Sequence, residues 1–198
     1  SIVLNGEELV NMPEYKRAQR LGRVYQDPAM GSCGSLTVEE NLSLADHKGE
    51  FYGLQKSVQA ERRDAYREML QSFGLGLEDR LGQRVDTLSG GQRQALALLM
   101  ATLKPLELLI LDEHTAALDP KSSETVMEKT NEIVRSEHRT TLRVTHNLNF
   151  ALEYGDRLLM FHDGNIVLDR SGEEKERTSL EDVLELFNAI SIEAGNSI

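Results

Sequence analysis

Cysteine, positive charge and long apolar runs are scarce in this 198-residue sequence. The single cysteine, Cys33, cannot form a disulfide within the chain, which is compatible with a reducing cytoplasm. Cys33 lies in a Gly/Ser-rich loop, and we expect it to have no catalytic role. The longest nearly apolar stretch, Ala95 to Leu103, is far shorter than the about 20 residues that a membrane-spanning helix needs. Because Ser1–Leu4 also does not resemble a signal peptide, we expect any membrane role to be peripheral.

Basic residues are outnumbered by acidic ones, with 22 Lys and Arg against 33 Asp and Glu and a net charge of −11. A protein that binds nucleic acid by neutralising phosphates needs a basic face, so this balance argues against a nucleic-acid partner. The sequence shows no internal repeat and no low-complexity tract. Charged residues make up 28% and apolar residues 39%, which is typical of one globular domain with room for a subdomain.

Strand and helix patterns alternate along the chain, which predicts an α/β fold with a mainly parallel sheet. From Val38 to Val85 the patterns are helical without a good strand, so this stretch is predicted to be a helical subdomain inserted into the sheet domain. The predicted strands are Ser1–Leu4, Leu21–Tyr25, Leu106–Leu111, Thr140–Thr145 and the hairpin Arg157–His162 with Ile166–Arg170. The predicted helices are one capped by Thr37, Ser57–Phe73, Ser89–Leu103, one opened by Asp119-Pro120 and running to Arg135, and Ser179–Ile190.

A glycine-rich turn, Leu88-Ser89-Gly90-Gly91-Gln92-Arg93-Gln94, lies where a loop becomes a helix. Two glycines allow a backbone to approach a ligand closely, and the N–H groups of a helix N-terminus attract phosphate. Ser89 adds a hydroxyl donor. These residues alone favour the plainer alternative, a capped helix after a flexible turn.

Two carboxylates, Asp112 and Glu113, follow the apolar run Leu108–Leu111. Ligands of open α/β sheets bind at the carboxyl ends of the strands. One carboxylate could hold Mg²⁺ through water, and the next could orient or deprotonate an attacking water. The alternative is that both carboxylates simply leave the core and become solvated.

Two further polar residues, His146 and Gln26, follow predicted strands. His146 could donate a hydrogen bond to a terminal phosphate, and the amide of Gln26 could ligate Mg²⁺ or position water. Each residue is uninformative by itself, since a lone loop histidine or glutamine usually has no such role.

Together these motifs resemble the ABC ATPase family. Leu88–Gln94 matches the family's signature motif, Leu108–Glu113 its Walker B strand with the catalytic glutamate, and Ala117–Asp119 its D-loop. His146 is similar to the switch histidine and Gln26 to the Q-loop glutamine, and the resemblance runs from Ser1 to about Arg170. Within the family, the segment from Leu111 to Pro120 looks like a branch of bacterial amino-acid-type importers that use a substrate-binding protein.

The resemblance implies a P-loop NTPase-like α/β fold with a mainly parallel sheet, helices on both faces and an inserted α-helical subdomain. Residues 1–36 and 89–198 would form the RecA-like ATPase core, without its N-terminal β-subdomain, and residues 37–88 the helical subdomain. The implied cofactors are ATP and Mg²⁺. The implied partners are a transmembrane permease, a second ATPase subunit in a head-to-tail dimer and, indirectly, a substrate-binding protein, all at the cytoplasmic face of the membrane.

The resemblance also assigns roles to individual residues. Glu113 would be the general base or water-orienting group, and His146 would touch the γ-phosphate. Gln26 would sense that phosphate and, with Asp112, support Mg²⁺. Nucleotide held by the opposite subunit would be contacted by Ser89, Gly90, Gly91 and Gln92, and Asp119 would lie at the subunit interface.

The sequence departs from the family in lacking any Gly-x-x-x-x-Gly-Lys-Ser/Thr, the Walker A loop, and contains no Gly-Lys pair. We interpret Ser1–Gly6 as the strand after that loop, with the adenine-stacking aromatic expected upstream. What remains is one helix end, worth about 0.3–1 kcal/mol, and two charge-assisted hydrogen bonds of about 1.5–3 kcal/mol each. A sum of about 3–7 kcal/mol, from which the entropic costs of binding must be subtracted, predicts millimolar affinity for ATP or weaker, and no hydrolysis by the isolated chain.

Three single residues also depart from the family pattern. Ala116 replaces the usual D-loop serine, His114 stands where proline is common, and Arg143 lies in a strand expected to be apolar, where burial without a partner would be costly.

Two alternative functions remain open. One is a non-catalytic ABC-like regulatory or interaction module, and the other is a soluble ABC protein that acts on nucleic acid or ribosomes, which the acidic charge opposes.

Overall fold

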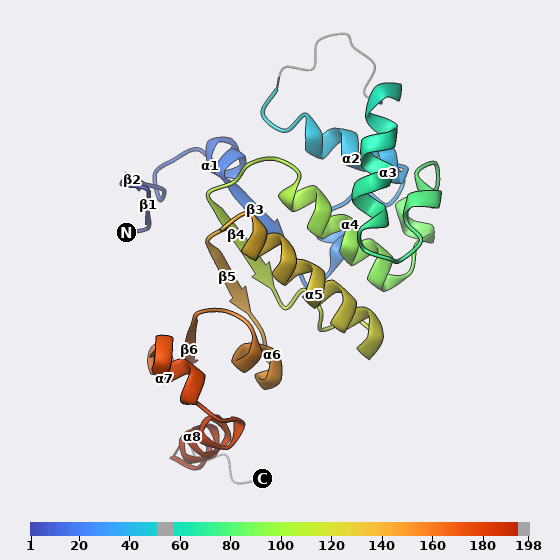
Figure 1. Cartoon of the computed structure of the whole chain (residues 1–198). Coiled ribbons are helices and arrows are strands. Elements are labelled where there is room, and N and C mark those ends of the chain that lie inside the picture. Colours follow the sequence, from blue (N-terminus) through green and yellow to red (C-terminus); the bar gives the residue numbers. More distant parts are fainter. Residues whose placement is uncertain (51–57, 194–198) are drawn as a thin grey trace. The chain divides into compact units, whose positions relative to one another are not determined.

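The computed structural model describes residues 1–50 and 58–193, and these form two compact units, Ser1–Val144 and Thr145–Ile198 (Figure 1). The strands of the first unit are β1 (Val3–Leu4), β2 (Glu7–Glu8), β3 (Leu21–Val24), β4 (Leu108–Asp112) and β5 (Thr141–Val144). Its α-helices are α1 (Glu14–Arg20), α2 (Val38–Asp46), α3 (Arg63–Gln71), α4 (Gly90–Thr102) and α5 (Pro120–Ser136). Among the described residues, no helix is both long and apolar enough to span a membrane.

The central sheet of the first unit has the order β3-β4-β5, and both strand pairs are parallel. Val24 of β3 pairs with Leu111 of β4, and Leu111 in turn pairs with Arg143 of β5. The carboxyl ends of all three strands therefore meet at one edge. The predicted fold class, α/β with a parallel sheet and helices, is confirmed.

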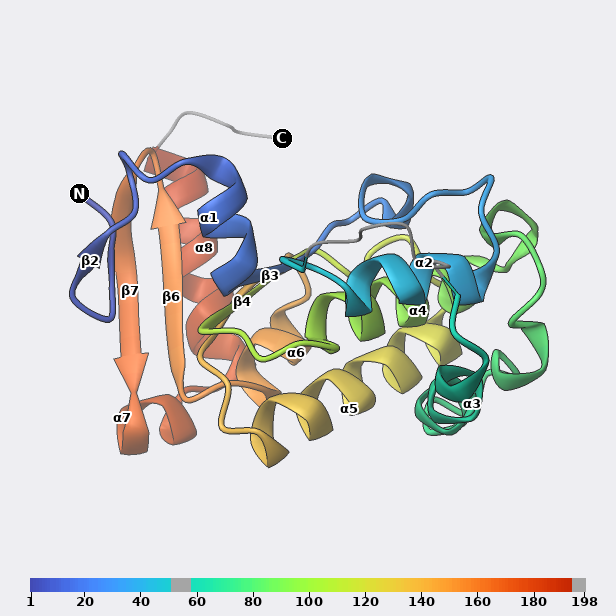
Figure 2. The same cartoon turned by 90° about the horizontal axis from the view of Figure 1, so that it is seen from above.

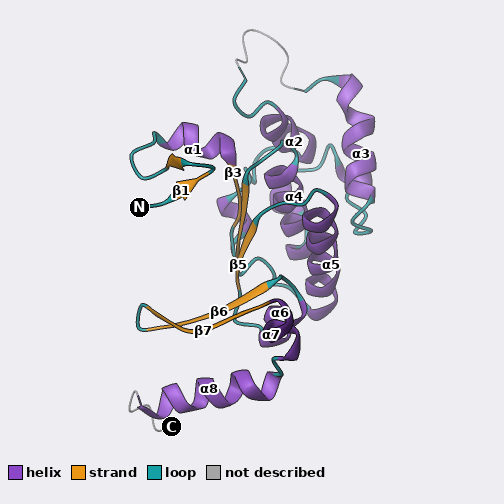
Figure 3. Ribbon diagram, turned by 60° about the vertical axis from the view of Figure 1, so that its left-hand side comes forward, coloured by secondary structure: helices purple, strands orange, loops and turns teal. Residues whose placement is uncertain are grey.

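One face of this sheet is buried beneath α4 and α5, which lie on the same side of it (Figure 3). Leu109 and Leu111 are completely buried on that face. At Gly22 the end of α4 comes so near that an added Cβ would lie 2.7 Å from Ala101 O and from Leu106 Cδ2. Glycine is therefore required there by packing rather than by backbone conformation.

The other face of the sheet is more open to solvent. Alternate residues of a strand point to opposite faces, and on β5 these are Leu142 and Val144, which are 55% and 54% exposed. Arg23 of β3 shares this face. The sheet thus has one packed side and one side that carries exposed apolar and charged groups.

The described residues between 37 and 88 are mainly helical, with α2 and α3 as the longest elements. Thr37 caps α2 with a capping box, in which Thr37 Oγ1 accepts from Glu40 N while Glu40 accepts from Thr37 N. Within the described part of 37–88 the only strand-like contact is an isolated bridge between Thr37 and Arg84. Short 3₁₀ turns fill the connections, at Ala60–Arg62, Glu78–Arg80 and Val85–Thr87.

The helix predicted over Ser57–Phe73 is shorter than expected. Ser57 lies outside the described residues, and α3 begins only at Arg63, after the 3₁₀ turn. Inside the insertion the buried Tyr66 donates its hydroxyl to Asp46 at 2.9 Å, which ties α3 to α2. Burial of the phenol is the main cause that raises the Tyr66 pKa, so it stays neutral.

The second unit contains α6 (Leu148–Glu153), β6 (Arg157–His162), β7 (Asn165–Ser171), α7 (Gly172–Arg177) and α8 (Leu180–Glu193). The predicted hairpin is confirmed, and Figure 2 shows its two antiparallel strands side by side. Because His162 pairs with Asn165, the turn has two residues, Asp163 and Gly164, with φ of 46° and 77°. Two successive positive φ angles are the mark of a type I′ turn.

Several short elements were not predicted, namely β2, α1, α6 and α7. Helix α1 has readable signals, since Pro13 precedes it, Glu14 lies in its first turn and basic residues lie in its last. Its last residue, Arg20, donates from Nη2 to Glu107 Oε2 at 2.6 Å, which joins α1 to the start of β4.

Candidate functional site

The carboxyl-terminal edge of the central sheet carries two of the predicted site residues, Asp112 at the end of β4 and Glu113 directly after it. Because Val24, the last residue of β3, pairs with Leu111, Asp112 ends β4 one residue beyond that pair, and Glu113 follows it. Gln26 is exposed, while Asp112 and Glu113 are half-buried. Asp112 and Glu113 thus lie at the carboxyl end of β4, and a role for Gln26 beside them stays a prediction.

Asp112 has a partner that the sequence did not reveal. Arg23 Nη2 lies 2.9 Å from Asp112 Oδ2, and the Arg23 guanidinium lies over the Tyr25 ring, 4.4 Å from its centroid. The Asp112 side chain remains 39% exposed. The carboxylate predicted to support Mg²⁺ is thus neutralised by an arginine from the neighbouring strand.

The oxygen ligands at this edge are too few to bind Mg²⁺ alone, and they fit an Mg²⁺ ion that is already bound to phosphates and water. Among the described residues no cluster of three or more His, Cys, Asp or Glu could hold a metal ion. Mg²⁺ at nucleotide sites usually takes one or two protein oxygens and completes its shell with phosphates and water. Asp112 and Gln26 can supply such oxygens once Arg23 has released the carboxylate.

The backbone turns sharply at Glu113. Its φ is 44°, a left-handed conformation that a residue with a side chain rarely adopts. Glu113 N donates to Val144 O at 3.0 Å, and Glu113 O accepts from Ala116 N at 2.9 Å. Glutamate is thus held at the strand tip by hydrogen bonds on both sides of its strained backbone.

His114, the next residue, is buried, with only 2% of its surface exposed. Its Nε2 lies 3.1 Å from Thr130 Oγ1 of α5. Burial, with a smaller contribution from the positive charge of Arg143, lowers the pKa of His114 to about 3, so the ring is neutral at physiological pH. Arg143 is half-buried and pairs with Leu111, so it faces the packed side of the sheet.

The glycine-rich turn opens α4 as a capped helix. Ser89 Oγ accepts from Gln92 N at 3.3 Å, and Gln92 Oε1 accepts from Ser89 N at 3.1 Å. Gln92 Nε2 also donates to Leu75 O at 2.9 Å. Both polar ends of Gln92 are therefore engaged within the chain, whereas the first-turn amides of Gly90 and Gly91 have no acceptor in the helix itself.

The two glycines of this turn have different reasons to be glycine. A Cβ on Gly91 would lie 2.8 Å from Ser122 Oγ and 2.9 Å from Ser122 Cβ, so α5 leaves no room for a side chain. A Cβ on Gly90 would meet only Leu118 Cδ2 at 3.6 Å, an ordinary contact. Packing explains Gly91 but leaves Gly90 without a structural requirement.

Asp119 caps α5, as predicted, with Pro120 as the first helical residue. Its Oδ1 accepts from Ser122 N at 3.1 Å. Hydrogen bonds from Ser122 lower the Asp119 pKa, so the carboxylate is charged at neutral pH. The Ser89 cap and the Asp119 cap thus lie at the two helix ends that meet through Gly91 and Ser122.

His146 belongs to the second unit and is exposed. Its neighbour Asn147 donates from its backbone to Thr145 Oγ1 at 3.0 Å and accepts from Phe150 N at 3.2 Å, which caps α6. The loop that carries His146 is therefore ordered by local hydrogen bonds immediately before a helix.

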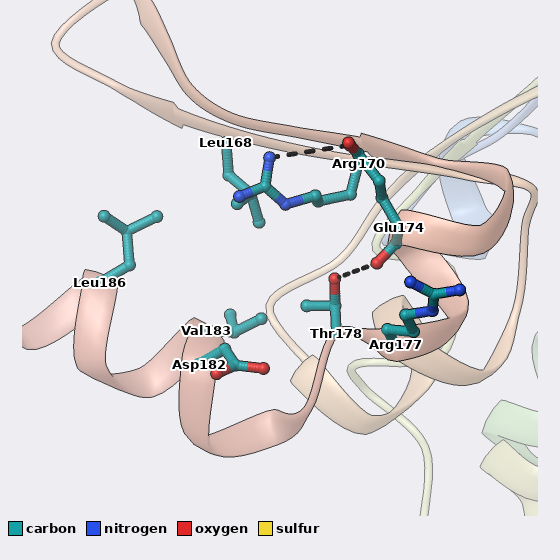
Figure 4. Close-up of a pocket in the computed structure, with 8 residues that line it drawn as sticks. All are labelled: Leu168, Arg170, Glu174, Arg177, Thr178, Asp182, Val183 and Leu186. Atoms are coloured by element: carbon teal, nitrogen blue, oxygen red, sulfur yellow. Dashed lines mark hydrogen bonds and ion pairs between the residues drawn. The ribbon is translucent and has the colours of Figure 1, made fainter.

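A cavity of about 520 Å³ also lies in the second unit, between β7, α7 and α8 (Figure 4). Its lining charges are largely satisfied locally, since Arg170 pairs with Glu174 at 3.9 Å and Arg177 with Glu173 at 2.9 Å. The predicted site residues are not among the eight that line it. We therefore place the candidate site at the sheet edge and the α4 turn rather than here.

The sequence is similar to those of known ABC transporter proteins. A sequence model of the ABC transporter family matches residues 1–116. A tyrosine transport ATP-binding protein of Clostridioides difficile is 49% identical over 186 residues, covering 94% of this chain and 74% of the relative. A probable branched-chain amino acid transport ATP-binding protein, LivF, of Archaeoglobus fulgidus is 31% identical, covering 87% of this chain and 69% of the relative.

The fold is also that of solved ATP-binding cassettes. A dimeric cassette in a post-hydrolysis state, bound to ADP and Pi, superimposes with a TM-score of 0.70 at 25% identity, covering 85% of this chain and 71% of that one. A nucleotide-free cassette of an ABC transporter gives a TM-score of 0.67 at 22% identity, which supports the fold alone. The glycine-rich turn, the acidic strand tip and these similarities together show that the chain belongs to the ABC transporter ATP-binding family.

Proposed function

We propose that this chain is the ATP-hydrolysing subunit of an ABC importer for amino acids. The observation that supports the proposal is the parallel pairing of β3 with β4, after which the chain carries Gln26 beyond β3 and Asp112 and Glu113 at the end of β4. The similarity to amino acid transport ATP-binding proteins supports the substrate class. Both relatives are named ATP-binding proteins, so we expect the nucleotide to be ATP.

The proposed roles follow from what each group can do. Glu113 orients or deprotonates the attacking water, and Asp112 with Gln26 supports Mg²⁺. His146 donates a hydrogen bond to the terminal phosphate. Phosphoryl transfer depends chiefly on positioning and on neutralising the charge that develops, and Mg²⁺ supplies much of that charge when bound.

The α4 turn would act on the nucleotide of a second copy of the chain. Gly90 and Gly91 offer backbone N–H groups at the positive end of a helix, and Ser89 adds its hydroxyl. The lack of any packing reason for Gly90 supports close approach of a phosphate at that position. Asp119 would lie at the interface of the head-to-tail dimer, and dimeric relatives are known.

The proposal extends to architecture and partners. Residues 1–36 and 89–198 would form the ATPase core, and residues 37–88 the helical subdomain that faces a transmembrane permease. A substrate-binding protein would deliver the amino acid, and the subunit would act at the cytoplasmic face of the membrane.

Binding of ATP by residues 1–198 alone tests the energetic part of the proposal. These residues contain no Gly-Lys pair, and Arg23 neutralises Asp112, so we expect a Kd for Mg²⁺–ATP in the millimolar range or weaker. Calorimetric titration measures this directly. Micromolar binding would contradict the affinity argument.

Hydrolysis tests the catalytic part. The protein encoded by the gene, purified together with its permease, should hydrolyse ATP, and Glu113→Gln should lower kcat by about 10²-fold or more because the water loses its orienting base. Glu107→Gln, directly before the start of β4, is the matched control and should leave kcat near the wild-type value. Failure of the wild-type assembly to hydrolyse ATP would favour a non-catalytic regulatory module.

A further inference from the structure

The hydrogen bond between His114 and α5 has a direction that the structure determines. Thr130 Oγ1 lies 2.7 Å from Val126 O, one helical turn back, and donates to it. A hydroxyl has a single hydrogen, so toward His114 Nε2, 3.1 Å away, Thr130 can only accept. This pairing assigns the hydrogen of the neutral His114 ring to Nε2.

This bond is attached to the most strained backbone at the candidate site. Glu113 has a φ of 44°, and such a conformation persists in a non-glycine residue only where the surroundings hold it. Hydrogen bonds to Val144 and Ala116 hold the Glu113 backbone, but both partners lie on the strand side or within the turn itself. His114 is the adjacent side chain that joins the turn to a separate element, the helix opened by Asp119.

We propose that His114, as its Nε2–H tautomer, is a positioning residue that ties the Glu113 turn to α5 and thereby fixes the direction of the Glu113 carboxylate. The inference rests on the proposed hydrolytic role of Glu113. His114 itself is buried and touches neither nucleotide nor water in this account. An aliphatic residue could fill its volume but could not reach Thr130 with a donor.

The tautomer of His114 and its hydrogen bond to Thr130 can both be tested without measuring ATP hydrolysis. In ¹⁵N-histidine spectra of the chain, which has five histidines, the signal lost in His114→Gln should show a protonated Nε2 and an unprotonated Nδ1. His114→Leu and Thr130→Val both remove the bond, and the second does so with an isosteric side chain. His114→Gln keeps an N–H donor of similar reach.

Amide hydrogen exchange reports whether the bond holds the turn. Relative to the Leu109 amide, which bonds to Thr140 O within the sheet, the Glu113 and Ala116 amides should exchange about 10-fold faster in His114→Leu and in Thr130→Val. In His114→Gln they should stay within about 3-fold of wild type. Equal acceleration at Leu109 would show general destabilisation, and unchanged exchange would show that the bond does not hold the turn. Either result overturns the proposal, as does a protonated Nδ1.

Steady-state kinetics test whether the hydrogen bond between His114 and Thr130 affects ATP hydrolysis. In the assembly with the permease, His114→Leu should lower kcat by about 10-fold or more with little change in KM, because a small displacement of a catalytic group is costly while binding is untouched. His114→Gln should restore most of kcat. If wild-type assemblies do not hydrolyse ATP, the proposed function fails while the exchange result still decides the role of His114 in the turn.

Discussion

The start of α4 and the turn that begins at Glu113 are fixed in different ways. At α4, local hydrogen bonds between Ser89 and Gln92 form a capping box within four consecutive residues. At Glu113, the backbone is strained, and a buried histidine reaches α5 to Thr130. The Ser89 cap is built from contacts near in sequence, whereas the turn at Glu113 depends on contacts between elements.

This difference bears on what each region can tolerate. A capped helix end presents its free amides whatever the rest of the chain does, which suits a surface that must meet a second subunit. A strained strand tip keeps its geometry only while the helix behind it is in place. We therefore expect mutations of the Ser89 cap to act locally, and mutations at contacts between elements, such as Gly91 with Ser122 or His114 with Thr130, to act at a distance.

The largest expected effect separates the two glycines of the α4 turn. Gly91→Ala places a Cβ within 3 Å of Ser122 and should destabilise the chain by about 1–3 kcal/mol, because α4 and α5 must move apart. Gly90→Ala meets only an ordinary contact and should leave the unfolding midpoint nearly unchanged. Chemical denaturation of both variants measures this, and equal losses would show that the difference in packing is unimportant.

An intermediate effect is expected from the cap itself. Ser89→Ala removes the acceptor for Gln92 N and should cost about 0.5–2 kcal/mol of stability. Ser89→Thr is the matched control, since it keeps the hydroxyl. Thermal unfolding followed by circular dichroism would reveal the loss, and a Ser89→Ala variant as stable as the Ser89→Thr variant would refute the capping argument.

The smallest effect concerns pH and distinguishes the two caps. Ser89 does not ionise, whereas the Asp119 pKa is lowered in the folded chain by hydrogen bonds from Ser122. The stabilisation by Asp119 is therefore fully present above its unfolded pKa of about 3.9 and is lost as pH falls through the lower folded value. Unfolding of wild type and of Asp119→Asn should converge in that acidic range, and a pH-independent difference would contradict the assignment.

Much of the fold could be predicted because its signals are local. The caps at Thr37, Ser89 and Asp119 are each predicted from a few neighbouring residues, such as Pro120 directly after Asp119, and all three are present. The parallel sheet, whose strands end at one edge, followed from the alternation of strand and helix patterns along the chain.

What the sequence did not predict depends on register and on contacts between elements. The Arg23–Asp112 pair requires β3 and β4 to be aligned so that the two side chains share one face. The burial of His114 against Thr130 joins residues 16 positions apart on different elements. Short elements such as α6 and α7 lack the length over which a periodic pattern can be recognised.

The most direct test of the central claim mixes two inactive variants. If ATP is held between the α4 turn of one chain and the Glu113 tip of another, Glu113→Gln and Gly90→Asp disable opposite halves of each site. In assemblies with the permease that contain one chain of each kind, one of the two sites then regains both intact halves. We predict that mixing restores ATP hydrolysis that neither variant shows alone, whereas a mixture that remains inactive would contradict a site shared between two chains.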